Sequence, residues 1–179
     1  MRRSDPLIVG GGPAGTAAAI SLGVSGVRPI LLERQHVTGD ALCGGFLSWR
    51  TLETLGRLGI EGLDGHAIDR LRVFAGTATA EARLPHQALG VSRQQLDSLL
   101  LARAEAVGAG IERGVTVREW RNGMLETADG TRLSPETLFL ANGKHDIRGL
   151  ARPRPEAGTQ SLGIRVQLSA HPALTRLVG

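Results

Sequence analysis

The stretch PLIVGGGPAG, from Pro6 to Gly15, decides the fold of this chain. Its apolar residues Leu7 to Val9 form a strand pattern that runs directly into a G-x-G-x-x-G triplet at Gly10, Gly12 and Gly15. Small residues follow from Ala14 to Leu22 and predict a helix. A strand, a glycine triplet and a helix in this order indicate a loop that holds a dinucleotide.

Each glycine of the triplet has a separate task in such a loop. Gly10 allows the tight turn, Gly12 lets backbone N–H groups approach a pyrophosphate, and Gly15 lets the helix pack against the strand. Pro13 fits the first helical turn, where its missing N–H is no loss. The N-terminus of this helix is therefore predicted to be an anion site.

A second apolar strand, Pro29 to Leu32, ends at Glu33. An acidic residue about 20 positions after the triplet reaches the ribose hydroxyls of a bound adenosine. Because a carboxylate repels a 2′-phosphate, FAD or NAD is favoured over NADP. The alternative is that Glu33 is a solvated charge at a strand end and the glycines form only turns.

The remaining pattern alternates helices and strands. Ser48 and Ser92 are expected to cap helices that run to about Arg57 and Val107. Turn signals at Asn122-Gly123 and Asp129-Gly130 predict a three-stranded antiparallel meander. The predicted strands are Ile68–Ala75, Thr79–Leu84 with Pro85 as its end, Gly114–Val117, Val117–Arg121, Met124–Thr127, Thr131–Leu133, Thr137–Ala141 and Ser161–Leu168, and a short helix is expected over Pro172–Leu177.

Composition excludes several classes of protein. Of the 179 residues, 41% are hydrophobic and 21% charged, which is ordinary for one globular core. The net charge of +4 comes from arginines spread along a chain with only 3% aromatic residues, which argues against nucleic-acid binding. The five histidines lack a metal-ligand spacing, so no metal site is predicted.

Cellular context follows from the cysteine count and the uncharged N-terminal run. Cys43 is the only cysteine, which excludes an internal disulfide framework and favours a reducing compartment, so we expect a cytoplasmic protein. The run from Leu7 to Val27 carries no charge, but its glycines and Pro13 argue against a membrane span or a signal peptide.

Five segments together resemble a known family. They are G-G-G-P-A-G at Gly10–Gly15, L-L-E-R at Leu31–Arg34, C-G-G at Cys43–Gly45, S-R-x-x-L-D at Ser92–Asp97 and F-L-A-N-G-K-H at Phe139–His145. The chain resembles the FAD-binding domain of the glutathione-reductase-type flavoproteins, and within them the geranylgeranyl-reductase-like and aromatic-hydroxylase-like FAD-dependent oxidoreductases. The resemblance implies an α/β, Rossmann-type FAD/NAD(P)-binding domain with a parallel sheet and a three-stranded antiparallel meander.

The resemblance also implies roles for residues. The pyrophosphate is expected at Gly10, Gly11, Gly12, Pro13, Ala14 and Gly15, the adenosine ribose at Glu33, and the adenine or phosphate side at Arg34. Cys43 and Gly44 are expected near the ribityl chain and isoalloxazine, and Arg93 near the phosphate or ribityl region. Val117 is expected to meet adenine, and Ala141, Asn142 and Gly143 to pass behind the AMP half. No catalytic residue is identified.

The implied activity is that of an FAD-dependent oxidoreductase, a reductase or a monooxygenase, acting on a small and apolar substrate, with NAD(P)H as a possible electron donor. An NAD-dependent dehydrogenase and a non-enzymatic remnant of the fold are the alternatives. Oligomeric state stays open.

The family carries a later G-D motif that this chain does not contain. We therefore expect residues 1–150 to form an incomplete FAD-binding domain and residues 151–179 to begin a substrate domain or a connecting segment. The chain is expected to be part of a longer protein and to hold FAD weakly by itself.

Overall fold

A computed structural model of the chain describes residues 2–3, 5–41, 43, 45–153, 164 and 172. The strand predicted at 161–168 and the helix predicted at 172–177 lie outside these residues, apart from Ile164 and Pro172. So do Leu42 and Gly44, although the rest of the C-G-G segment is described.

A four-stranded parallel sheet forms the centre of the fold. Its order is β11 (Leu138–Leu140), β2 (Leu7–Val9), β3 (Ile30–Glu33) and β7 (Gly110–Arg113). The strand predicted at Gly114–Val117 is wrong, because the chain turns at Gly114 with φ +75° and the sheet strand lies before it. The other three strands lie where the sequence predicted them.

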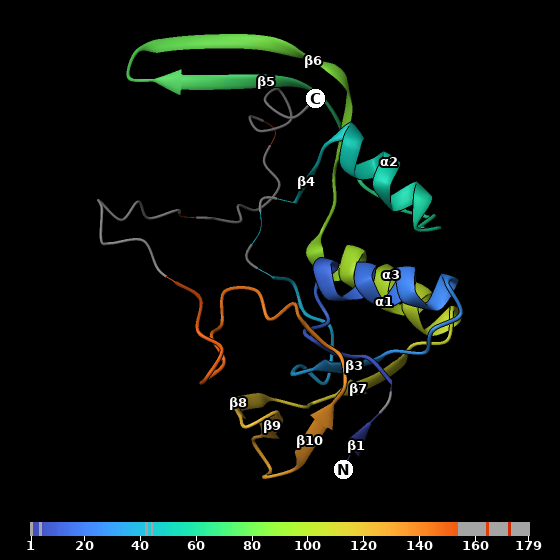
Figure 1. Cartoon of the computed structure of the whole chain (residues 1–179). Coiled ribbons are helices and arrows are strands. Elements are labelled where there is room, and N and C mark those ends of the chain that lie inside the picture. The colour runs from blue at the N-terminus through green and yellow to red at the C-terminus, as the bar shows by residue number, and fades with distance from the viewer. Residues whose placement is uncertain are drawn as a thin grey trace.

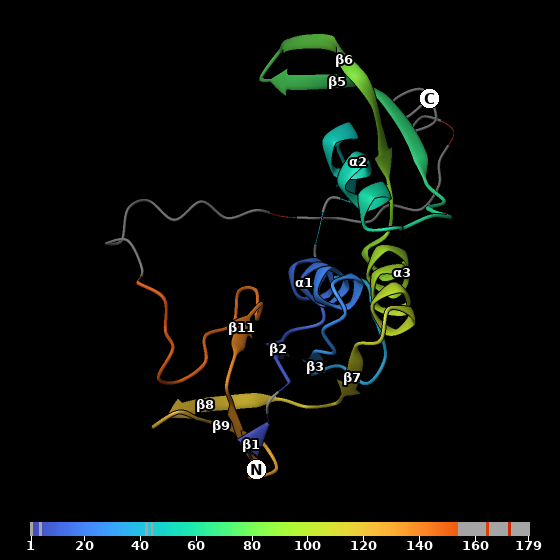
Figure 2. The same ribbon diagram turned by 45° about the vertical axis from the view of Figure 1, so that its right-hand side comes forward.

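Helices cover one face of this sheet and the meander covers the other (Figures 1 and 2). The helices are α1 (Pro13–Val24) and α3 (Arg93–Ala106), and the meander is β8 (Val117–Arg121), β9 (Met124–Thr127) and β10 (Arg132–Pro135), to which β1 (Arg2–Arg3) adds a short parallel strand. Side chains of a strand alternate between faces, so Ile8 packs with the helices while Leu7 and Val9 pack with the meander. The predicted fold class is confirmed.

A second group of elements lies on the far side of α1 and α3 from the central sheet (Figure 1). It contains β4 (Phe46–Leu47), α2 (Trp49–Arg57) and the long hairpin of β5 (His66–Ala75) and β6 (Ala78–Gly90). Pro85 does not end β6, so that prediction is wrong. The pairing of β5 with β6 shifts between Ile68 and Arg70, and Pro85 falls in this irregular part, where a residue without an N–H is tolerated.

Both predicted serine caps are confirmed. The Ser48 hydroxyl accepts a hydrogen bond from the Thr51 N–H, and the Ser92 hydroxyl accepts one from the Gln95 N–H at 3.2 Å. The sequence Ser92–Gln95 also fits a capping box, but the Gln95 side chain does not accept the Ser92 N–H, because its Oε1 is buried without a hydrogen-bond partner. Ser92 thus fixes the start of α3, with Arg93 as its first residue.

Candidate functional site

The three glycines of the triplet differ in their surroundings. Gly10 adopts φ +109°, and a Cβ there would collide with the Ala141 carbonyl oxygen. A Cβ on Gly15 would collide with the Gly10 carbonyl oxygen. Around a Cβ on Gly12, by contrast, the nearest described atom is a terminal nitrogen of Arg93 at 4.0 Å. Gly10 and Gly15 therefore serve packing, and Gly12 leaves space above the loop.

The N-terminus of α1 opens onto this space. Gly12 is the N-cap, Pro13 lies in the first turn, and within the described residues no side chain caps the helix. The first intrahelical hydrogen bond runs from the Thr16 N–H to the Gly12 carbonyl at 3.0 Å. The N–H groups of Ala14 and Gly15 lie before this bond and therefore have no acceptor within the helix. With no acidic residue in the first turn, the positive end of the helix dipole can stabilise an anion.

Glu33 is fixed beside the loop by backbone groups. Its Oε2 accepts a hydrogen bond from the Gly11 N–H at 2.6 Å, and its Oε1 accepts one from the Gln35 N–H at 2.8 Å. A Cβ on Gly11 would lie 2.7 Å from Oε2, so only glycine allows this approach. Each oxygen keeps a further lone pair with which to accept a hydroxyl. Arg34, the next residue, is exposed.

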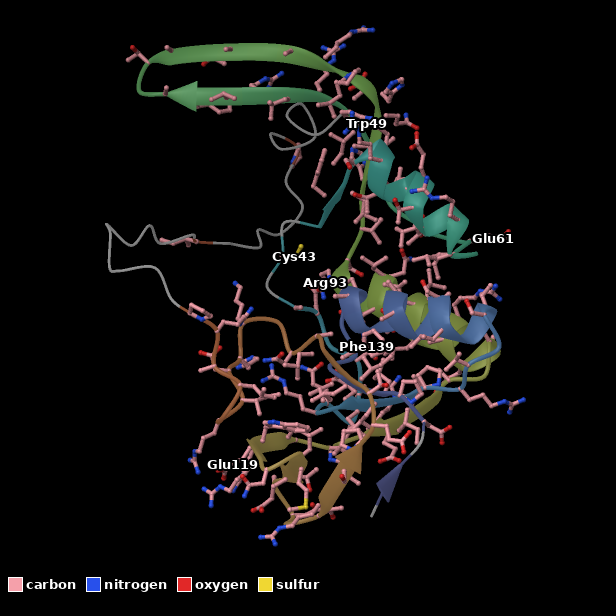
Figure 3. All side chains as sticks on the ribbon, in the orientation of Figure 1. Cys43, Trp49, Glu61, Arg93, Glu119 and Phe139 are labelled. Atoms are coloured by element: carbon pink, nitrogen blue, oxygen red, sulfur yellow. The ribbon has the colours of Figure 1, made fainter. Side chains whose placement is uncertain are left out.

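Arg93 lies on the opposite side of the open space. Its guanidinium donates to Asp97 through Nε at 3.1 Å and through a terminal nitrogen at 2.8 Å. Its backbone N–H donates to Asp40 Oδ1 at 3.0 Å. Figure 3 shows Arg93 and Cys43 near each other, close to the N-termini of α1 and α3. The hydrogen bond to Asp97 raises the pKa of Arg93, burial opposes this, and the Cys43 side chain adds a smaller increase.

The segment after β11 packs against the glycine loop at Gly10. The Ala141 N–H donates to the Val9 carbonyl at 2.9 Å, which extends the pairing of β11 with β2. The Asn142 side chain donates to the His145 carbonyl, and the Gly143 carbonyl accepts a bond from Arg152 at 2.7 Å. Ala141 thus packs against Gly10, while Gly143 lies at the exposed end of the segment.

The structure brings most of the predicted residues to one end of the sheet. The glycine loop and Glu33 lie together, and Arg93 lies across the open space above Gly12. Val117 is the first residue of β8. Two residues before it, the Val115 N–H donates to the Glu33 carbonyl at 3.0 Å, which places the start of β8 near the end of β3. Gly44 lies outside the described residues. Contact of each residue with a cofactor stays a prediction.

Sequence reasoning did not identify Asp97 and Asp40 as parts of this site. Asp97 lies four positions after Arg93 on a predicted helix, and an opposite charge at that spacing is a usable signal. Asp40 carried no such signal, because it lies in the loop between β3 and β4 and meets Arg93 only through the tertiary fold.

A separate hollow lies on the meander. It has a volume of about 620 Å³ and is lined by Arg118, Glu119, Glu126, Asp146, Ile147, Arg148 and Ala151. Glu119 pairs there with Arg148 at 3.6 Å and with Arg121 at 2.7 Å. Since none of the predicted cofactor residues lines this hollow, the glycine loop, whose donors and acceptors converge, is the stronger candidate for the site.

Comparison with known proteins gives one consistent family. The FAD binding domain family matches residues 3–148. Geranylgeranyl diphosphate reductase, chloroplastic, from Oryza sativa subsp. japonica is 32% identical over 122 residues, which cover 65% of this chain and 26% of that protein. Rifampicin monooxygenase from Streptomyces venezuelae is 29% identical over 182 residues, which cover 93% of this chain and 38% of that protein.

Solved structures agree on the fold. The crystal structure of p-nitrophenol 4-monooxygenase from Pseudomonas putida superposes with a TM-score of 0.66 at 18% identity, covering 78% of this chain and 40% of that one. The chain thus spans well under half the length of these relatives. No helix in the described part of the chain is long and apolar enough to cross a bilayer.

Proposed function

The chain belongs to the FAD binding domain family, and from that membership we propose that it forms the cofactor-binding part of an FAD-dependent oxidoreductase. The observation that carries the proposal is the arrangement around Gly12, where a cationic side chain and a helix N-terminus face one open space. A fixed carboxylate, Glu33, lies beside the same loop. The membership confirms the predicted resemblance.

The residues fit the chemistry of a flavin dinucleotide. A diphosphate needs N–H donors and positive charge, which the first turn of α1 and Arg93 supply. Ribose hydroxyls need an acceptor held in place, which Glu33 supplies. We therefore assign the diphosphate to Gly10–Gly15 with Arg93, and the adenosine ribose to Glu33.

The remaining contacts are assigned by their place around this loop. Arg34 and Val117 belong to the adenine side, and Ala141, Asn142 and Gly143 lie behind the AMP half. Cys43 and Gly44 belong to the flavin side, since Cys43 lies beside Arg93. When bound, the flavin supplies hydride or oxygen chemistry, while the protein orients it.

For the reaction and the substrate we propose only a general class. The relatives include a protein named as a reductase and one named as a monooxygenase, so we propose one of these two reactions on a small apolar molecule. NAD(P)H is proposed as the electron donor. A cytoplasmic location remains a prediction from the single cysteine.

The test is a titration of the purified chain with FAD and, separately, with NAD, followed by flavin fluorescence and by calorimetry. We expect saturable binding of FAD, because the described residues supply donors for a diphosphate and a fixed acceptor for a ribose. NAD should bind more weakly. Binding of NAD in preference to FAD would support the dehydrogenase alternative, and binding of neither would support a remnant without a cofactor.

A further inference from the structure

The Arg93 guanidinium is held by a carboxylate that is almost completely buried. Asp97 is only 8% exposed, and both of its oxygens accept hydrogen bonds from Arg93. Ion pairs at this helical spacing usually lie on the solvent face, where they contribute little. Burying a carboxylate is costly unless it is paired, so this pair has a defined geometry rather than a mobile one.

The bidentate contact determines where the rest of the guanidinium lies. Asp97 accepts hydrogen bonds from Nε and from one terminal nitrogen, and the Cys43 side chain also interacts with the guanidinium, so part of its five N–H groups remains for a ligand. That terminal nitrogen lies 4.0 Å from the Cβ position of Gly12. This edge of the guanidinium therefore borders the space above the glycine loop.

The main chain of Arg93 is fixed as well. Asp40 accepts its backbone N–H at 3.0 Å, so the residue is held at its backbone by the loop that leads to Cys43 and at its side chain by Asp97. An arginine held at both ends loses little conformational freedom when it binds an anion, which favours affinity.

We propose that Asp97 is a positioning residue that aims Arg93 at the cofactor diphosphate. The inference rests on the proposed function for its ligand and goes beyond it in naming Asp97. Charge and positioning predict opposite effects for Asp97→Asn. Removing a negative charge near a diphosphate strengthens binding if only net charge matters, and loosening the Arg93 side chain weakens binding if its orientation matters.

The experiment is a double-mutant cycle on the full chain, with FAD titrated into the parent, Asp97→Asn, Arg93→Ala and the double variant. We expect Asp97→Asn to weaken FAD binding about 5- to 10-fold, and to change it less than about twofold when Arg93 is already alanine. Arg93→Lys, which keeps the charge but cannot form the two-pronged contact, should weaken binding about as much as Asp97→Asn. Thermal unfolding of each variant verifies that it is folded.

Three results would overturn the inference. They are unchanged or tighter FAD binding by Asp97→Asn, an equal loss from Asp97→Asn in both backgrounds, and parental affinity of Arg93→Lys. A readout without FAD separates this inference from the proposed function. In the cofactor-free chain, the Arg93 Nε proton should give an NMR signal protected from exchange, and Asp97→Ala, which removes the acceptor, should abolish that protection. If the parent bound no FAD, the proposed function would fail, while this signal would still test the contact. An unprotected Arg93 Nε signal in the parent chain would contradict the inference.

Discussion

The glycine loop and the β5–β6 hairpin are built in opposite ways. At the loop, backbone packs against backbone, and the strands around it bury Leu7, Ile8 and Leu31 completely. The hairpin stands apart from the central sheet in Figure 1, and its Leu71, Val73 and Phe74 are 55%, 51% and 64% exposed. Tight packing at Gly10 and Gly15 leaves no room for an added atom, whereas an exposed ribbon can accept substitutions.

The β5–β6 hairpin nevertheless has different residue types on its two faces. Leu71 lies opposite Ala82 and Val73 opposite Ala80, so one face is apolar, while Arg72 lies opposite Glu81 on the other face. Arg70 and Arg72 both bond to the Glu81 carboxylate, at 3.0 and 2.6 Å. Exposed pairs of this kind contribute little, and a two-stranded ribbon alone is marginal. The hairpin therefore depends on its base near β4 and α2 rather than on its own contacts.

The largest effect is expected for Gly15→Ala. The new Cβ would collide with the Gly10 carbonyl, so the first turn of α1 must move away from β2. We expect a loss of about 3 kcal/mol or more in the free energy of unfolding, measured by urea denaturation. Gly56→Ala is the matched control, because Gly56 is also helical and no described atom lies within 4 Å of its Cβ position. That variant should gain up to about 1 kcal/mol. Similar values for the two variants would contradict the packing role of Gly15.

Gly12→Val separates binding from stability. Its φ of −76° suits any residue and its Cβ direction is open, so the free energy of unfolding should change by less than about 1 kcal/mol. The side chain would occupy the proposed diphosphate space, and FAD affinity should fall about 100-fold or more. Calorimetric titration measures this. Parental affinity in a folded Gly12→Val variant would place the diphosphate elsewhere.

Glu33→Ala should have a smaller effect on binding. Losing a charge-assisted hydrogen bond to the ribose should weaken FAD binding by about 1 to 2 kcal/mol. Glu61→Ala is the control, since this exposed carboxylate lies beyond α2, far from the loop in Figure 3. Equal affinities for Glu33→Ala and the parent chain would remove Glu33 from the site.

The smallest effect is expected in the hairpin. Leu71→Ala should change the free energy of unfolding by less than about 0.5 kcal/mol, because the side chain is already more than half exposed. Leu31→Ala, the same change at a completely buried position, should cost about 2 to 5 kcal/mol. Denaturation of both variants compares them directly. A large loss for Leu71→Ala would show that the hairpin face is covered in solution.

Local signals in the sequence were sufficient for much of the fold. The apolar run before Gly10, the serines at positions 48 and 92 and the Asn-Gly and Asp-Gly turns each act within a few residues, so β2, α2, α3 and the meander follow from them. The predictions failed where a distant contact decided the structure. Strand β7 is short, partly polar and set by pairing with β3, and β6 passes Pro85 because the irregular pairing with β5 absorbs it.

The sequence by itself determined the glycine loop and the place of Glu33 at a strand end, because turn glycines and strand ends are properties of adjacent residues. Only the tertiary structure decided that Arg93 borders Gly12, that Asp40 holds the Arg93 backbone there, and that the Gly11 N–H fixes Glu33. These contacts join the glycine loop, the β3–β4 loop and the start of α3, segments far apart in the chain. The packing of α1 and α3 on the same face of one sheet is what brings the start of α3, with Arg93, next to the glycine loop.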